Sequence, residues 1–342
     1  MQFGEKMQMG GLGQEATNEM VEFALDRGIN YIDTADVYSQ GESERLVGNA
    51  IQGVRDEIVL STKCRLPMGE NVNHSGATRA NIMREIDASL ERLQTDYVDL
   101  YQVHGWDPYT PLEETLRALD DLVRQGKVRY VGLSNYTAWQ AATALGIQER
   151  EGLEPFVTAQ MYYSLVGRDL EQEFMSFADY HDVGIIVWSP LAGGFLAGKY
   201  DRENPPPEDT RFAEAGQFVP FDVETGFEIL DALREVGDRH GVSPARVAIA
   251  WTLSRANISS VLIAARSLEH LEDDIKAVEL ELTDEDLDLL DEVSDPGVNY
   301  PRWMVLQLAM AEDPRAKTLE PEKFADGGPW ENLHDRKMPL EG

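Results

Sequence analysis

The sequence predicts an α/β fold in which short parallel strands alternate with longer helices. Short apolar runs alternate along the chain with segments of helical periodicity, which is the order of repeated βα units. Reactive polar residues also stand where the apolar runs end, as in enzymes built on a parallel barrel. The chain has 342 residues, of which 42% are hydrophobic. One large domain is therefore expected, because single α/β barrels routinely exceed about 250 residues.

The predicted elements follow one another in a regular order. The apolar runs predicted as strands are residues 30–34, 58–63, 97–104, 128–134, 156–160, 184–188 and 260–264. The predicted helices, with apolar residues three and four apart, are residues 17–27, 42–51, 78–93, 112–124, 137–148, 170–181, 221–240, 244–254, 268–278 and 284–293. One helix precedes the first strand, and every strand is followed by at least one helix.

These units predict a (β/α)8 TIM barrel, which needs eight strands, so one more strand should precede residue 17. Residues 1–13 are too few and too rich in glycine to supply it. Either the first strand is missing or truncated at the N-terminus, or the sheet has a gap. We expect the former, because a gap would expose a strand edge.

Two irregular segments complete the predicted organisation. Residues 201–216 contain three consecutive prolines and form a long loop, and loops of that length in a barrel are more often functional than idle. The barrel is assigned to residues 1–294. Residues 295–342 are rich in proline, glycine and charge, and they are expected to pack on the barrel as an irregular C-terminal tail.

The charge of the chain is strongly acidic. There are 62 acidic and 30 basic residues, which gives a formal net charge of −32 and a pI near 4.4. This charge argues against nucleic acid and anionic membranes as partners. The acidic residues are spread over nearly every helix and only 8 basic residues are lysines, which indicates a surface adapted to high salt, as in halophilic organisms. The alternative is an acidic docking surface for a basic partner.

Cysteine and hydropathy indicate the compartment. Cys64 is the only cysteine, so no intramolecular disulfide is possible and a reducing environment is expected. No apolar run approaches the length of a membrane helix, and the N-terminus lacks the apolar region of a signal peptide. A cytoplasmic location is therefore predicted. His74 has no second His or Cys at ligand spacing, so no metal site is predicted.

Three reactive side chains mark the ends of successive predicted strands. Asp33, Lys63 and His104 end the first three apolar runs, and Tyr38 follows Asp33 by five residues. A lone residue of this kind at a strand end is usually just solvated. Because the carboxyl ends of barrel strands meet at one mouth, the four side chains together are expected to converge there.

These segments resemble the aldo-keto reductase family, in particular its branch of NADP-dependent oxidoreductases that are similar to potassium-channel β subunits. The resemblance extends from about residue 17 to residue 293, and the stretches that carry it are YIDTADVYSQGESERLVGNAI, IVLSTK, SLERLQTDYVDLYQVHGWDP, KVRYVGLSNY, AQMYYSLVGRD, WSPLAGGFLAGKY and VLIAARSLEHLEDDI. No GxGxxG motif follows a predicted strand, so a Rossmann domain does not compete with this assignment.

The resemblance implies a catalytic tetrad of Asp33, Tyr38, Lys63 and His104. Reduction of a carbonyl leaves a developing alkoxide that needs a proton, and Tyr38 is the implied donor. Because a free tyrosine has a pKa of about 10, a cation beside it should favour the phenolate, and Lys63 is that cation. Asp33 is implied to pair with Lys63, and His104 to orient the substrate carbonyl.

The resemblance also implies residues that bind a nicotinamide cofactor. Ser134, Asn135 and Gln160 would bind the carboxamide, and Trp188 would stack on the ring. The residues implied for the pyrophosphate loop are Ser189, Leu191, Gly193 and Lys199, and those implied for the adenosine end are Arg266, Ser267, His270, Asp273 and Asp274. Arg266 would favour NADPH through the 2′-phosphate, although NAD remains possible, because family members commonly have other residues at Ala264, His270 and Asp274.

The predicted function is therefore NADPH-dependent reduction of aldehydes or ketones to alcohols. One alternative is a cofactor-binding regulatory or scaffold barrel, which has less need of the complete tetrad. Another is a hydrolase or aldolase with Lys63 as a Schiff-base nucleophile, which would need Lys63 free of a carboxylate partner. The expected partner is a small carbonyl substrate, whose identity the sequence leaves open along with the oligomeric state.

Overall fold

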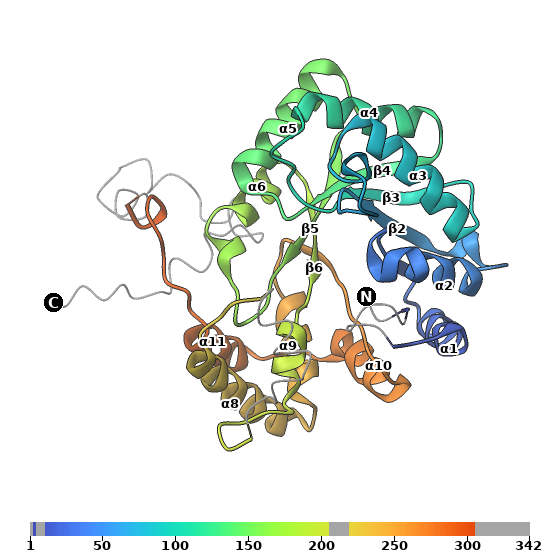
Figure 1. The fold of residues 1–342 in the computed structure, drawn as a ribbon. Helices are drawn as coiled ribbons and strands as arrows, with labels where there is room; N and C mark the ends of the chain where they lie inside the picture. Colours follow the sequence, from blue (N-terminus) through green and yellow to red (C-terminus); the bar gives the residue numbers. More distant parts are fainter. Residues whose placement is uncertain (1–2, 5–10, 205–218, 305–342) are drawn as a thin grey trace. The chain divides into compact units, whose positions relative to one another are not determined.

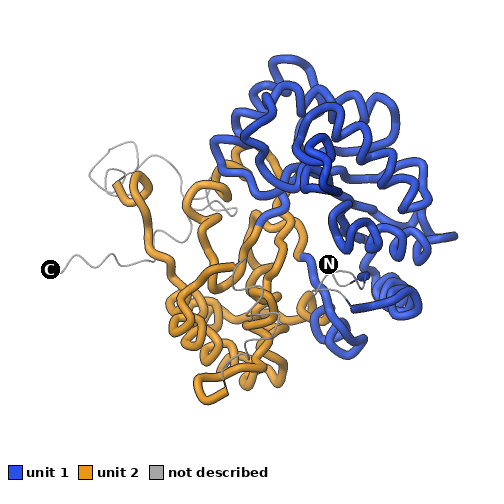
Figure 2. Tube along the Cα trace, in the orientation of Figure 1, with its two compact units in different colours: residues 1–161, 262–275 blue, residues 162–261, 276–342 orange. Residues whose placement is uncertain are grey.

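The fold is described from a computed structural model, and the description covers residues 3–4, 11–204 and 219–304. The chain forms two compact units (Figure 2). Unit 1 comprises residues 1–161 and 262–275, and unit 2 comprises residues 162–261 and 276–342. Each unit is described by itself.

The strands of unit 1 are all parallel and lie side by side in chain order (Figure 1). They are β1 (Tyr31–Asp33), β2 (Val59–Cys64), β3 (Val98–Val103), β4 (Val128–Ser134) and β5 (Phe156–Tyr162). The register places Lys63 beside Gln102, and Gln102 beside Gly132. A Cβ atom on Gly132 would lie 2.5 Å from Thr158 Oγ1 and 3.2 Å from Gln102 Cγ, so a residue without a side chain is required there.

The helices of unit 1 connect these strands and pack on one another in sequence. They are α1 (Gln14–Leu25), α2 (Glu42–Ala50), α3 (Arg79–Leu93), α4 (Leu112–Arg124), α5 (Ala138–Glu151) and α10 (Leu268–Ile275). Neighbours from α1 to α5 contact each other in chain order, and they form the outer layer beside β2, β3 and β4 in Figure 1. Thr78 caps α3 by accepting from Asn81 N, and Gly152 ends α5 in the left-handed conformation.

A small second core joins the two ends of unit 1 that are distant in sequence. Met20 of α1 packs with Ala265 and with Leu271 of α10. Ile263 is one of the partly buried apolar residues that pack against them. Helix α1 therefore lies beside the segment 262–275.

Unit 2 contains the remaining strands and helices of the described chain. Strand β6 (Gly184–Trp188) pairs in parallel with β7 (Ile258–Val261). The helices are α6 (Phe174–Tyr180), α8 (Val223–His240), α9 (Pro244–Leu253) and α11 (Asp284–Val293). Arg168 is 2% exposed and bonds to Glu171 and Asp291, so its charge is paired within the core of this unit.

Short 3-10 helices interrupt the connections. They are Tyr38–Gly41, Arg55–Glu57, Val72–His74, Asp169–Glu171, Ala192–Ala197 and Lys276–Glu279. The sequence did not distinguish them, because single turns carry no periodic pattern of apolar residues, and residues 170–171 and 276–278 were predicted as parts of longer helices. The segment 169–171 explains why α6 begins at Phe174 and not at residue 170 as predicted.

The order and type of the predicted elements are confirmed within the described residues. One strand was predicted at the wrong bounds: residues 260–264 were expected, and Ile258–Val261 is observed. Ile263 packs against the core between α1 and α10 instead of extending the strand. The prediction of a missing or truncated first strand falls largely on residues outside the described ones; of the N-terminal segment, Phe3 and Leu12 form an isolated parallel bridge.

Most of the C-terminal tail and of the proline-rich loop also lies outside the described residues. The boundary at residue 294 and the packing of residues 295–342 on the barrel stay predictions. Of the loop, residues 201–204 are described, where Asp201 Oδ1 accepts from the backbone of Glu203 and Asn204.

Candidate active site

The strand ends of unit 1 bring the four predicted catalytic side chains together. Asp33 ends β1, Lys63 lies near the end of β2, and His104 directly follows β3. Because these strands are parallel neighbours, their carboxyl ends lie at one edge. Tyr38 begins the 3-10 helix that follows β1.

The Lys63 ammonium is buried and fully engaged. Its Nζ forms a short ion pair with Asp33 Oδ2, donates to Thr34 O at 2.9 Å, and lies 3.5 Å from Tyr38 OH. The other oxygen of Asp33 accepts from Gln160 Nε2 at 2.8 Å. The carboxylate is thus held between a cation and an amide, which fixes the position of the ammonium.

Electrostatics keep Lys63 charged and Tyr38 protonated. Burial lowers the pKa of Lys63, but the Asp33 carboxylate and Tyr38 outweigh it, so the pKa lies above its usual value. Burial raises the pKa of Tyr38, and Lys63 offsets only part of that rise. The sequence-based expectation that Lys63 favours the phenolate is right in sign, but the net pKa of Tyr38 is raised.

His104 lies against Tyr38 as a neutral imidazole. The two ring centroids are 5.6 Å apart, with an interplanar angle of 75°. Burial, followed by the charges of Lys63 and Arg65, puts the pKa of His104 well below its usual range. Its Nδ1 atom is buried without a hydrogen-bond partner among the described residues. A neutral histidine here acts as a hydrogen-bonding group instead of a source of charge.

A polar row continues from these residues to β4 and β5. Ser134 Oγ donates to Gln160 O at 2.8 Å. Asn135 has a left-handed backbone, with φ of 55°, and its Nδ2 donates to His104 O at 3.2 Å and to Ser134 Oγ at 3.0 Å. These three predicted cofactor residues therefore lie together beside the tetrad.

The family follows from a comparison with known proteins. The profile described as "Aldo/keto reductase family" matches residues 1–295. This chain belongs to the aldo/keto reductase family. It is therefore an oxidoreductase by family membership.

Curated relatives of this aldo/keto reductase cover most of both chains. Versiconal hemiacetal acetate reductase of Aspergillus parasiticus is 33% identical over 310 residues, covering 85% of this chain and 90% of the relative. The uncharacterized oxidoreductase YrpG of Bacillus subtilis (strain 168) is 35% identical over 295 residues, covering 82% and 88%. A putative voltage-gated potassium channel subunit beta of Schizosaccharomyces pombe is 34% identical over 295 residues, covering 83% and 85%.

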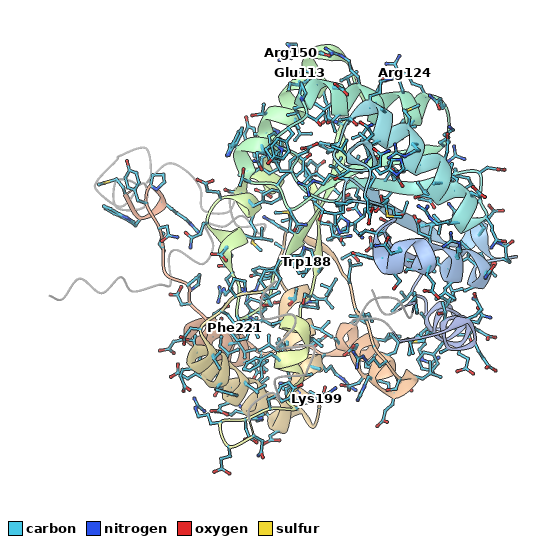
Figure 3. All side chains as sticks on the ribbon, viewed as in Figure 1. Glu113, Arg124, Arg150, Trp188, Lys199 and Phe221 are labelled. Carbon is cyan, nitrogen blue, oxygen red and sulfur yellow. The ribbon has the colours of Figure 1, made fainter. Side chains whose placement is uncertain are left out.

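Unit 2 of the aldo/keto reductase holds the residues predicted for the nicotinamide ring and the pyrophosphate. Trp188 lies at the end of β6, with its ring centroid 5.1 Å from that of Tyr162. Gly193 follows in a left-handed turn, with φ of 69°, and its N–H donates to Ser189 Oγ at 3.0 Å. Lys199 follows this turn in the chain, and Figure 3 shows it well apart from Trp188, so the lysine and the tryptophan are not neighbours. Leu191 is the residue before the turn.

The residues predicted for the adenosine end lie at and within α10 of unit 1. Arg266 and His270 are exposed, and Ser267 Oγ accepts from His270 N at 3.3 Å, which caps the helix. Asp273 is half-buried, whereas Asp274 is only 7% exposed. The five residues therefore do not form one open surface.

One polar residue of the site was missed at the sequence level. Gln102 is buried in β3, where its Nε2 donates to Ser61 Oγ at 2.8 Å and to Asp33 Oδ1 at 3.3 Å. It precedes His104 by two residues, so both side chains point to the same face of the strand. A polar residue on that face of an otherwise apolar run was the signal that could have identified it.

Two further features bear on the function classes considered above. Within the part of the chain that the structure describes, no group of three or more His, Cys, Asp and Glu side chains is arranged to hold a metal ion. The described helices also include none with the length and hydropathy needed to cross a membrane.

Proposed function

We propose that this protein is an NADPH-dependent reductase of aldehydes or ketones, with Tyr38 as the general acid. The observation that supports it is the chain of contacts from Asp33 through Lys63 to Tyr38, with neutral His104 beside the phenol. In this arrangement the buried Tyr38 hydroxyl can donate one proton, and the Lys63 cation is held beside it. The proposal takes the strands to close into the (β/α)8 barrel of the family.

The proton step follows from these contacts. As a hydride adds to the carbonyl carbon, the C=O π pair moves to the oxygen, and the Tyr38 proton passes to that oxygen to give the alcohol. The resulting phenolate is stabilised by Lys63, 3.5 Å away, and regains its proton from water. Asp33 keeps Lys63 charged and in place, and His104 donates a hydrogen bond that orients the carbonyl.

The residues present fit a nicotinamide cofactor. When bound, the cofactor supplies the hydride. Ser134, Asn135 and Gln160 offer amide and hydroxyl groups suited to a carboxamide, and Trp188 offers a flat aromatic surface. Gly193 has a left-handed backbone that gives the loop a tight turn, and the N–H groups of Ala192, Gly193 and Gly194 donate within this loop. Ser189, Leu191 and Lys199 complete the proposed pyrophosphate loop, and the proposed adenosine end is Arg266, Ser267, His270, Asp273 and Asp274.

NADPH is proposed over NADH because of Arg266. Its exposed guanidinium is suited to a 2′-phosphate, which NADH lacks. We expect Arg266→Ala to raise the KM for NADPH about tenfold or more and to leave the KM for NADH within about twofold. Initial rates with both cofactors measure this, and equal losses for both would show that Arg266 does not bind the phosphate.

The test of the mechanism is Tyr38→Phe. Because this change removes only the hydroxyl, we expect carbonyl reduction to fall by about 100-fold or more, while the dissociation constant for NADPH stays within about twofold. Reduction is followed by NADPH absorbance over a panel of aldehydes, ketones and sugars in high-potassium buffer. Unchanged turnover in this variant would remove Tyr38 as the acid.

The second candidate is a cofactor-binding regulatory or scaffold barrel with little turnover. It is favoured by the similarity to a protein named as a putative potassium channel subunit beta. The panel of aldehydes, ketones and sugars distinguishes the two candidates, because a scaffold would bind NADPH without oxidising it. In either case we propose a cytoplasmic location, a surface adapted to high salt and, for the enzyme, a small-molecule carbonyl substrate.

A further inference from the structure

Arg65 has a strained backbone two residues beyond Lys63. Its φ is +111°, a conformation that side-chain-bearing residues rarely adopt and that persists only where the surroundings hold it. Its carbonyl accepts from Gly76 N at 2.8 Å, and its Nη2 donates to Trp106 O at 2.8 Å. The backbone and the side chain are thus both held in place next to the catalytic lysine.

Arg65 forms no salt bridge within the described part of the protein, and the carboxylate whose charge it influences is Asp107, the pKa of which it helps to lower. Its Nε is buried without a hydrogen-bond partner among the described residues. Arg55, in contrast, pairs with Asp99 at 2.8 Å. Of the five N–H donors of the Arg65 guanidinium, the bond to Trp106 uses one.

The surroundings of Arg65 are rigid and adjoin the reacting groups. His104 N donates to the carbonyl of Cys64, the residue before Arg65, at 2.9 Å, and the Arg65 charge contributes to the lowered pKa of His104. Asp107 accepts from Ala77 N at 2.7 Å and from Thr110 Oγ1 at 2.7 Å, which ties the loop after β2 to the loop after β3. Lys63 forms an ion pair with Asp33, whereas the Arg65 guanidinium forms no ion pair with a described residue and interacts with the Asp107 carboxylate only through its charge.

We infer, on the basis of the reductase function proposed above, that Arg65 is a specificity-determining residue that selects carbonyl substrates carrying a carboxylate. The planar guanidinium matches a carboxylate with two parallel N–H···O bonds, which a lysine does not do. The substrate carbonyl lies at Tyr38 and His104, and its carboxylate lies at Arg65. The guanidinium without an ion-pair partner and the strained backbone both serve this contact.

Carboxylated aryl aldehydes are suitable probes, because Arg65 is bonded to the backbone of an aromatic cluster. The backbone carbonyl of Trp106 accepts from Arg65 Nη2, and the Trp106 ring centroid lies 5.2 Å from that of Tyr136 and 5.8 Å from that of Trp139. The experiment compares kcat/KM for 2-, 3- and 4-carboxybenzaldehyde with kcat/KM for benzaldehyde. We expect the best carboxylated isomer to exceed benzaldehyde about tenfold or more.

Three variants separate the effect of the Arg65 guanidinium from effects on the backbone and on the net charge. Glycine adopts a φ of +111° without strain, so Arg65→Gly keeps the backbone and should lower the ratio of carboxylated to neutral kcat/KM about 10- to 100-fold. Arg65→Lys keeps the positive charge but lacks the planar guanidinium, so the preference for carboxylated substrates should be reduced but not lost. Arg45 is exposed on α2, so Arg45→Met makes the same change in net charge and should leave the ratio unchanged.

Two results would overturn the role of Arg65: benzaldehyde reduced with no preference for any carboxylated isomer, or a preference that survives in Arg65→Gly. If neither aldehyde is reduced, the proposed function fails, and calorimetry still decides the question for Arg65. Binding of the 2-, 3- and 4-(hydroxymethyl)benzoates is then compared with that of benzyl alcohol in the presence of NADP⁺. Tighter binding of a benzoate that is lost in Arg65→Gly supports the carboxylate site, and equal binding in both proteins excludes it.

Discussion

Asp36 is fully buried two residues before Tyr38 and carries an unusual carboxyl. One of its oxygens accepts from Val37 N, and the other has no partner among the described residues. Burial, followed by the nearby carboxylates Glu44 and Glu85, raises its pKa well above the usual value. Asp36 is therefore a neutral acid under conditions in which most carboxyl groups in the molecule are charged.

The raised pKa of Asp36 makes its contribution to stability depend on pH. A carboxyl whose pKa is higher in the folded than in the unfolded state takes up a proton on folding, so its contribution falls as pH rises above the unfolded value of about 4. We expect Asp36→Asn, which stays neutral, to raise the midpoint of thermal unfolding relative to the parent protein at pH 8. The difference should shrink as pH falls toward 5. Circular dichroism melts at both pH values in high salt measure it, and a difference that is independent of pH would contradict it.

The convergence of the proposed catalytic residues was predictable from the sequence, because each of them ends or follows an apolar run. Asp33, Lys63 and His104 mark strand ends in the sequence and meet at the strand ends in the structure. Arg65 and Asp36 were not predictable. A positive φ leaves no trace in the sequence when the residue is not glycine, and the lack of a charge partner depends on residues far apart in the chain.

At the scale of elements, the contact between α2 and α3 depends on Gly48. A Cβ atom there would lie 2.7 Å from the backbone carbonyls of Arg92 and Leu93, and a backbone atom cannot move aside as a side chain does. We expect Gly48→Ala to destabilise the protein by about 1 to 3 kcal/mol, measured by urea unfolding. The prediction fails if this variant unfolds at the same urea concentration as the parent protein.

Gly146 of α5 is the matched control for Gly48. It also lies within a helix, but nothing comes within 4 Å of a Cβ atom built on it. Alanine is favoured over glycine in a helix interior by up to about 1 kcal/mol. Gly146→Ala should therefore stabilise the protein slightly, and a loss similar to that of Gly48→Ala would show that the contact between helices is not the cause.

The bounds of elements were less predictable than their order. The shift of β7 arises because an apolar run in a sequence does not reveal which neighbour it packs against, and the run around Ile263 packs on α1 and α10. Two helices were predicted at their observed bounds, and one of them, residues 112–124 (α4), has no side-chain cap. Residues 284–293 match α11, where Thr283 and Asp286 form a capping box.

At the scale of the molecule, 62 acidic residues stand against 30 basic residues, so the carboxylates cannot all be paired one to one. In the described parts, single guanidinium groups already serve several carboxylates: Arg202 contacts Glu224 and Asp231, and Arg239 contacts Glu235 and Asp286. The remaining carboxylates repel one another unless salt screens them. The screening length falls from about 10 Å in 0.1 M salt to about 3 Å in 1 M salt.

We therefore expect the midpoint of thermal unfolding to rise by about 5 °C or more between 0.1 M and 2 M KCl. Differential scanning calorimetry measures the rise. Sucrose at matched osmolality is the control, because it is excluded from protein surfaces but does not screen charge. A midpoint that does not change with KCl, or that rises equally with sucrose, would contradict the role of charge repulsion.

Cys64 gives this molecule a natural reporter of motion at strand β2. It is the only cysteine, it is fully buried directly after Lys63, and burial raises the pKa of its thiol. A maleimide or disulfide reagent therefore reaches sulfur only when β2 opens. The labelling rate measures how often the strand that carries the lysine separates from its neighbours, without any engineered probe.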